Sequence, residues 1–169
     1  MPKIPPYLLS LAGEYRVCSE LNMRGAFATI TYGNRKSVDV YVISDSQDRA
    51  LKIEVKTSQE ANFVTGITKK GFISQNGLVD DPHAPDFWVL FQIRPGDDAL
   101  FEERFFILSH REICESQAAC NKVYTDNYLK KHGKTFDLMK GVDTVSVSDV
   151  EKYEDDWAKI IKRLVRSDV

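Results

Sequence analysis

The chain has 169 residues, of which 43% are hydrophobic and 28% charged, and its formal net charge is −2. These values are typical of a folded globular protein and exclude a disordered chain. No apolar run approaches the roughly 20 residues of a membrane-spanning helix, and the first residues do not resemble a signal peptide. The three cysteines lack paired spacing, so we expect a cytoplasmic protein without a disulfide framework.

The first predicted elements are a helix and three short strands. Apolar side chains recur at helical spacing over residues 7–24, and Gly25 follows as a helix stop. Runs of β-branched and aromatic residues separated by polar turns come next. They predict strands over residues 26–32, 38–43 and 51–56.

The middle of the chain contains an irregular segment and two longer strands. Residues 58–85 are interrupted by glycines, and their pattern indicates neither a helix nor a strand. The apolar run 87–93 predicts a buried central strand, and residues 104–108 predict its neighbour across a turn.

Two capping boxes predict helices in the last third of the chain. Ser109 with Glu112 opens the first helix, and Ser148 with Glu151 opens a second helix over residues 149–166. The second helix would bury one apolar face, made of Val150, Tyr153, Trp157, Ile160, Ile161 and Leu164. This order of elements predicts an α/β fold with a mixed central β-sheet flanked by helices.

A carboxylate and an ammonium group share one face of the strand 51–56. Side chains alternate along a strand, so Glu54 and Lys56 point the same way while Val55 points into the opposite layer. Such a pair could hold a divalent cation and an attacking water. The alternative is an ordinary pair of solvated charges.

Asp39 stands at the start of an otherwise apolar strand. Aspartate is disfavoured in strands, and a buried carboxylate needs a partner or a metal ion. If the strands 38–43 and 51–56 pair as a hairpin, Asp39 and Glu54 lie near each other, and a hard divalent ion would relieve their repulsion. The alternative is a strand-start residue that is bonded to a turn.

Glu14 is predicted to face the sheet from the first helix. At about 100° per residue, it falls in the middle of the apolar stripe, whereas Glu20 falls on the solvent side. The stripe consists of Tyr7, Leu11, Cys18 and Leu21. The alternative for Glu14 is a place in a frayed first turn.

These acidic residues and the lysine resemble the motifs of the PD-(D/E)XK nuclease superfamily, in particular those of archaeal Holliday junction resolvases and restriction-type endonucleases. The resemblance covers residues 7–57, and valine stands where the family name has proline. The motifs are Gly13-Glu14, Val38-Asp39 and Glu54-Val55-Lys56-Thr57. The resemblance implies one domain over residues 1–169, with a restriction endonuclease-like core over about 7–110 and a helical extension over about 110–169.

The resemblance further implies a magnesium-dependent deoxyribonuclease that hydrolyses phosphodiester bonds. Asp39, Glu54 and the main-chain carbonyl of Val55 would ligate Mg²⁺, with Mn²⁺ as a substitute. Lys56 would position the attacking water or stabilise the transition state. Glu14 would complete the site as a ligand of a second metal or as an outer-shell carboxylate. DNA is the expected partner, with RNA left open, and the resemblance implies a homodimer.

Local basic residues must hold any nucleic acid, because the chain as a whole is mildly acidic. Arg35, Lys36, Lys69 and Lys70 are the candidates for phosphate contacts, and for each the alternative is a solvated surface residue. A catalytically inactive nucleic-acid-binding or assembly module on the same fold is the alternative function. Affinity for Mg²⁺ or Mn²⁺ distinguishes the two functions.

Overall fold

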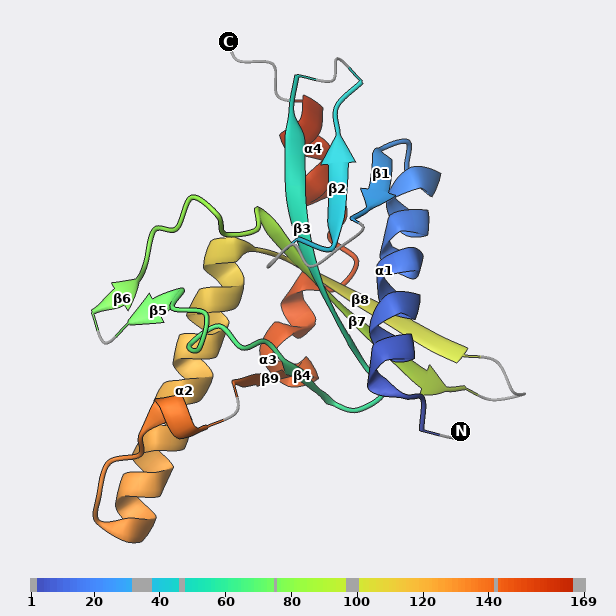
Figure 1. Ribbon diagram of the computed structural model, residues 1–169. Coiled ribbons are helices and arrows are strands. Elements are labelled where there is room, and N and C mark those ends of the chain that lie inside the picture. Colours follow the sequence, from blue (N-terminus) through green and yellow to red (C-terminus); the bar gives the residue numbers. More distant parts are fainter. Residues whose placement is uncertain are drawn as a thin grey trace.

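The protein was analysed as a computed structural model. It describes residues 3–31, 38–45, 48–74, 76–96, 101–141 and 143–165. A five-stranded mixed sheet with the order β1-β2-β3-β7-β8 forms its centre (Figure 1). The strands are β1 (Phe27–Ile30), β2 (Val40–Ile43), β3 (Ala50–Ser58), β7 (Phe87–Pro95) and β8 (Phe101–Ser109). Only β3 and β7 run parallel, and the other neighbours are antiparallel. The predicted α/β class and the mixed sheet are confirmed.

Helices cover both faces of the sheet because the side chains of its central strands alternate between two cores. Val89 and Phe91 of β7 belong to a core shared with α1 (Pro6–Met23) and α4 (Ala158–Val165). Trp88 and Leu90 belong to a second core on the other face, shared with α2 (His110–His132). A strand buried on both faces reads as a continuous apolar run, as predicted for this segment.

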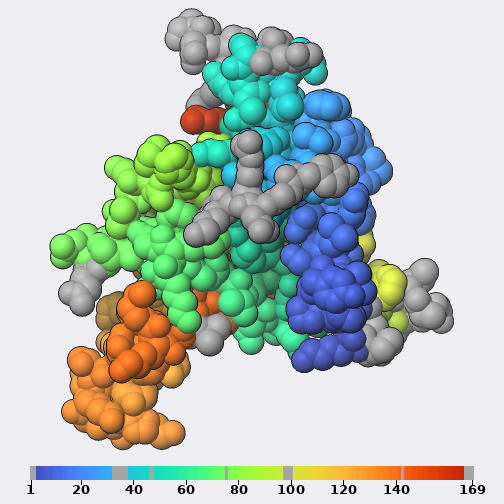
Figure 2. Space-filling view, viewed as in Figure 1, coloured from blue at the N-terminus to red at the C-terminus, as the bar shows by residue number. Residues whose placement is uncertain are grey.

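Helix α2 begins at the predicted capping box and then leaves the sheet. The Ser109 hydroxyl accepts a hydrogen bond from the main-chain N–H of Glu112, and the Glu112 carboxylate accepts one from Ser109 N–H. Its buried residues, Ile113, Cys114 and Gln117, all lie in the first third. The remainder projects from the body of the protein (Figures 1 and 2). No helix among the described residues combines the length and apolarity that crossing a membrane requires.

Short strands lie in the segment 58–85 that the sequence left unassigned: β4 (Asn62–Val64), β5 (Ile73–Ser74) and β6 (Gly77–Leu78). Further short elements lie between α2 and α4: the 3₁₀ turn η2 (Leu138–Lys140), β9 (Thr144–Ser146), α3 (Val147–Val150) and the 3₁₀ turn η3 (Glu151–Tyr153). Strand β4 pairs antiparallel with β9, and β5 pairs with β6. The β4–β9 pair therefore joins the chain after β3 to the C-terminal part of the protein.

The predicted helix over residues 149–166 is wrong, because the chain turns at Asp155 between η3 and α4. Asp155 has a φ of 53°, and its N–H donates to the carbonyl of Phe105 at 2.9 Å. Val150 lies in the second core, whereas Trp157 and Ile160 lie in the first. One straight helix cannot reach both faces of a sheet, so the chain breaks where it passes the edge strand β8. Helix α4 therefore packs on the sheet in the first core, together with α1.

The second predicted capping box is displaced by two residues. The box is formed by Ser146 and Asp149, whose carboxylate accepts hydrogen bonds from Ser146 N–H at 2.7 Å and from the Ser146 hydroxyl at 2.5 Å. It therefore opens the short helix α3. Ser148 and Glu151 were wrongly assigned because serine and an acidic residue recur at the same spacing within this segment.

The buried face of α1 also differs from the predicted stripe. Tyr7 and Leu11 are 73% and 43% exposed, whereas Val17 and Leu21 are fully buried. Glu20, predicted on the solvent side, is buried and forms ion pairs with Arg16 and Arg24. The contact face is set by a close approach of α1 to β3, which apolar periodicity alone does not reveal.

Candidate active site

The β2–β3 hairpin brings Asp39 beside Glu54, as the sequence predicted. Asp39 lies directly before β2, and its N–H donates to the carbonyl of Ile53 at 2.9 Å. Its carboxylate reaches the next amide on that side of β3 and accepts a hydrogen bond from Val55 N–H at 2.7 Å. Thus the Asp39 side chain continues the hydrogen bonding of the hairpin beyond the end of β2.

Glu54 is buried on the face of the sheet that also carries Trp88. Its carboxylate accepts hydrogen bonds from Lys56 Nζ and Lys70 Nζ, each 2.6 Å from the same oxygen, Oε1. The other oxygen, Oε2, is buried without a hydrogen-bond partner. A buried carboxylate oxygen without a hydrogen-bond donor is costly, so Oε2 is an oxygen that could accept a further ligand.

Helix α1 places Glu14 at the same site through a close contact with β3. A Cβ atom at Gly13 would overlap the Thr57 hydroxyl, so only glycine allows the helix to pack at this distance. The next residue, Glu14, is half-buried, and the negative charges of Asp39 and Glu54 influence its ionisation. The structure therefore brings together all four residues predicted as catalytic: Glu14, Asp39, Glu54 and Lys56.

The ionisation of the three carboxyls follows from burial and from their neighbours. Burial and the charge of Glu54 raise the pKa of Asp39 above its usual value. Burial and the charge of Asp39 likewise raise the pKa of Glu14. Burial acts in the same direction on Glu54, but Lys56 and Lys70 outweigh it and hold the pKa of that carboxyl below its usual range. Perturbed carboxyls in one cluster are typical of functional sites.

The donor set fits a hard divalent cation. Two carboxylates and a main-chain carbonyl are the oxygen ligands that Mg²⁺ prefers, usually together with water molecules. In a strand the N–H and C=O of one residue point to the same side, so the Val55 carbonyl faces the side on which Asp39 lies. Within the described ranges no three His, Cys, Asp or Glu side chains form a ready metal cluster. The protein ligands would therefore be few.

The remaining predicted site residues have different positions. Lys69 and Lys70 are both exposed, but the ammonium group of Lys70 is directed inward to Glu54, so the alternative of a merely solvated surface residue does not describe Lys70. Arg35 and Lys36 lie outside the described residues. The inward position of Lys70 was missed because residues 58–85 show no periodicity. The glycines that flank Lys70, Gly66 and Gly71, are typical of a tight turn and could have indicated this inward position.

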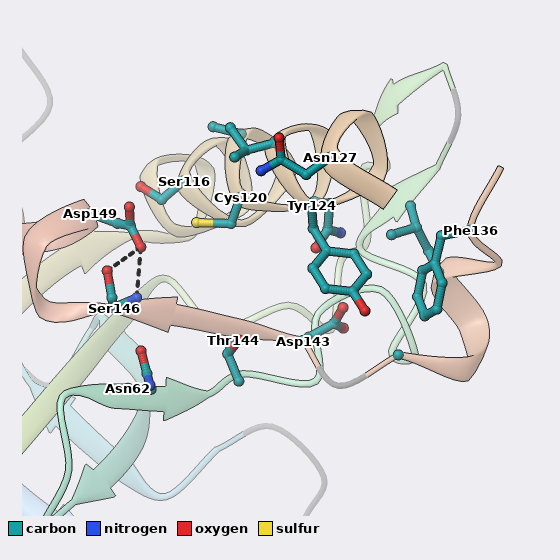
Figure 3. Close-up of a pocket in the computed structure, with 15 residues that line it drawn as sticks. Asn62, Ser116, Cys120, Tyr124, Asn127, Phe136, Asp143, Thr144, Ser146 and Asp149 are labelled. Carbon is teal, nitrogen blue, oxygen red and sulfur yellow. Dashed lines mark hydrogen bonds between the residues drawn. The ribbon is translucent and has the colours of Figure 1, made fainter. Parts of the chain in front are cut away.

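A separate pocket of about 660 Å³ lies between α2, β9 and η2 (Figure 3). Tyr124 and Cys120 line it from α2, while Asp143 and Asp149 line it from the opposite side. Burial, together with Asp149, raises the pKa of the Cys120 thiol to about 12, so this cysteine is no activated nucleophile. None of the four predicted catalytic residues lines the pocket.

Comparison with solved structures identifies an endonuclease-like fold. The chain is similar to a bacterial homing endonuclease, I-Ssp6803I, with a TM-score of 0.52, 12% sequence identity and coverage of 93% of each chain. Neither the family models nor the curated proteins searched match this sequence. At this identity the similarity concerns the fold, so the chemistry must be argued from the side chains.

Proposed function

We propose that this protein is a metal-dependent endonuclease that hydrolyses DNA phosphodiester bonds with a site of the PD-(D/E)XK type. The observation that carries the proposal is the convergence of Asp39, Glu54 and Lys56 at the end of the β2–β3 hairpin. Glu54 Oε2 is buried there without a hydrogen-bond partner. The similarity of the fold to an endonuclease supports the same reaction class.

Asp39, Glu54 and the Val55 carbonyl would hold Mg²⁺, or Mn²⁺ in its place. The chemistry that such an ion supplies when bound is Lewis-acid polarisation of the phosphate and a lowered pKa for an attacking water. The two carboxylates must both be ionised to take up the cation. Lys56 and Lys70 favour that state at Glu54, whereas Asp39 depends on the cation itself to offset its burial.

Lys56 would act on the substrate. Its side chain is 28% exposed, so the ammonium group can hydrogen-bond to Glu54 and still meet a phosphate or a water from solvent. An ammonium at this position stabilises the negative charge that grows on the phosphoryl oxygens as water attacks phosphorus. Glu14, near Asp39, would orient water from the side of α1.

Lys69 would contact a neighbouring phosphate of the DNA. It is exposed and lies one residue before Lys70, whose ammonium group reaches Glu54. Arg35 and Lys36 remain proposed phosphate contacts from the sequence. Contacts of this kind depend on released counterions, so DNA affinity should fall steeply with salt concentration. A homodimer also remains proposed, and light scattering of the purified protein tests it.

The test is cleavage of supercoiled plasmid, linear duplex, four-way junction and single-stranded DNA, each with Mg²⁺, with Mn²⁺ and with EDTA. We expect metal-dependent cutting of at least one substrate, abolished in Lys56→Ala. Lys52→Ala is the matched control, because Lys52 lies on the same face of β3 but donates to the Pro82 carbonyl at 3.0 Å. Absence of cutting, together with absence of Mn²⁺ binding, would contradict the proposal and favour the non-catalytic module.

A further inference from the structure

Lys70 shares with Lys56 a single oxygen of Glu54. Both ammonium groups lie 2.6 Å from Oε1, and both lie over the ring of Trp88, at 5.1 Å for Lys70 and 5.9 Å for Lys56. We propose that Lys70 is a second catalytic lysine, which contacts the scissile phosphate, and that Asp143 is the residue that positions it. This inference rests on the proposed nuclease function.

The turn that carries Lys70 is fixed at both ends. Gly66 and Gly71 have φ values of 70° and 78°, which an L side chain rarely adopts. Between them, Lys70 N–H donates to the Gly66 carbonyl at 2.9 Å, which closes one helical turn. Ile67 and Phe72 are buried in the second core at the two ends. The turn is therefore anchored by packing, and its lysine is aimed at Glu54.

Asp143 fixes the same turn from the C-terminal part of the chain. Its buried carboxylate accepts hydrogen bonds from the N–H groups of Thr68 at 2.5 Å and Lys69 at 3.4 Å. Its main-chain carbonyl accepts one from Thr65 N–H at 3.0 Å. Asn121 of α2 adds a hydrogen bond to the Thr68 hydroxyl at 3.1 Å. A negative group on the first amides of a turn satisfies donors that would otherwise be unpaired.

The segment after the nuclease-like core thus reaches the candidate active site through this turn. Asp143 lies 75 residues beyond Thr68 in the sequence, and Figure 3 shows it beside Thr144 of β9, whose strand pairs with β4. The C-terminal extension is therefore part of the machinery that shapes the site. It determines where the second lysine stands.

Two ammonium groups on one carboxylate oxygen carry more positive charge than Glu54 alone requires. Lys56 is held by β3, a rigid central strand, and one ammonium suffices to pair with Glu54. The second positive charge is available to a phosphodiester that approaches the site, where negative charge develops in the transition state. Lys70 is 30% exposed, so its ammonium can reach such a substrate without leaving the turn.

The catalytic role is tested by steady-state cleavage kinetics of Lys70→Ala and Lys70→Arg. We expect Lys70→Ala to lower kcat about 100-fold with little change in KM, and Lys70→Arg to recover part of the loss. Lys52→Ala is the matched control and should keep the wild-type kcat. A wild-type kcat in Lys70→Ala would overturn the inference and leave the proposed function intact. Failure of the wild-type protein to cut any DNA would overturn both.

The positioning role is tested by NMR of the lysine side-chain Nζ groups, which needs no activity. In Asp143→Ala, which removes the acceptor oxygens of the turn, we expect the Lys70 Nζ resonance to shift toward that of a solvated lysine, and to shift more than the Lys56 resonance. Because Asp143 is buried, Asn121→Ala provides a milder second variant, with a smaller shift of Lys70. An unchanged Lys70 resonance in both variants, with the fold retained, would overturn the role of Asp143.

Discussion

The Asp39 carboxylate and the Val55 N–H are joined by a hydrogen bond of 2.7 Å across the end of the β2–β3 hairpin. This bond uses one carboxylate oxygen, Oδ2, to extend the backbone pairing by one step. It thereby fixes the direction of the Asp39 side chain relative to Glu54, which lies on the neighbouring strand. Asp39 thus has a structural role in addition to its proposed role as a ligand.

Asp39→Asn should separate these two roles. The amide oxygen of asparagine can still accept the Val55 N–H, but the negative charge is lost. We expect the cleavage rate to fall about 100-fold or more, while the melting temperature changes by less than about 4 °C. Parallel measurement of plasmid cleavage and thermal unfolding checks this prediction.

Asp45→Asn is the matched control for that variant, because Asp45 is an exposed residue in the turn of the same hairpin. Its cleavage rate and melting temperature should equal those of the wild type. If Asp39→Asn cut DNA at the wild-type rate, Asp39 would not be a ligand.

The pH dependence of stability should reveal the buried charge of Asp39. Its folded-state pKa is raised above 3.8 by burial and by Glu54, so its contribution to stability is fully present below pH 3.8. That contribution is lost as the pH rises through the folded-state pKa. In EDTA at pH 7 we therefore expect Asp39→Asn to be more stable toward urea than the wild type, with the difference closing toward pH 3.

Addition of Mg²⁺ at pH 7 should reverse that order, because the cation stabilises only the protein that binds it. The lowered pKa of Glu54 makes the opposite contribution to the pH dependence of stability, but Glu54 is present in both proteins, so it does not affect their order. A wild-type protein more stable than Asp39→Asn in EDTA would contradict the electrostatic account of the site.

The close packing of α1 on β3 can be tested at Gly13. An added Cβ would overlap Thr57 Oγ1 and lie 2.9 Å from Thr57 Cβ, so the helix must move away from the strand. We expect Gly13→Ala to lower the free energy of unfolding by about 1–3 kcal/mol and to reduce cleavage by displacing Glu14. Urea unfolding measures the first effect.

The double variant Gly13→Ala/Thr57→Ala serves as the rescue control. It removes the hydroxyl that the new methyl group meets first, so part of the lost stability should return. Equal stability of Gly13→Ala and the wild type would show that the contact is not tight.

Much of the proposed site could be predicted from local sequence rules. Alternation along β3 placed Glu54 and Lys56 on one face, and the polar turn after Ile43 made the hairpin with Asp39 predictable. These inferences needed only neighbours along the chain or one turn between paired strands. The same is true of the capping box at Ser109 and Glu112.

The missed features depend on contacts between distant segments. The bonds from Asp143 to the turn of Lys70 join residues more than 70 positions apart, and no period in the sequence marks them. The break at Asp155 arises because its flanking segments serve opposite faces of the sheet. A helical period appears across the break, since residues on both sides of it are apolar.

Asp155 offers a test of that break. A φ of 53° is unfavourable for aspartate but accessible to glycine. We therefore expect Asp155→Gly to raise the free energy of unfolding by about 0.5–1 kcal/mol. The neighbouring change Asp156→Gly should lower it, because Asp156 forms an ion pair with Lys159 and lacks a positive φ. A loss of stability in Asp155→Gly would argue for a continuous helix.

The central claim, that Asp39 and Glu54 form a divalent-cation site, is tested most directly by isothermal titration calorimetry with Mn²⁺ at pH 7. The account predicts saturable binding to the wild type and to Asp45→Asn, with binding strongly weakened in Asp39→Asn and Glu54→Gln. Binding of equal strength in all four proteins would place the metal elsewhere. Absence of binding to the wild type would contradict the claim outright.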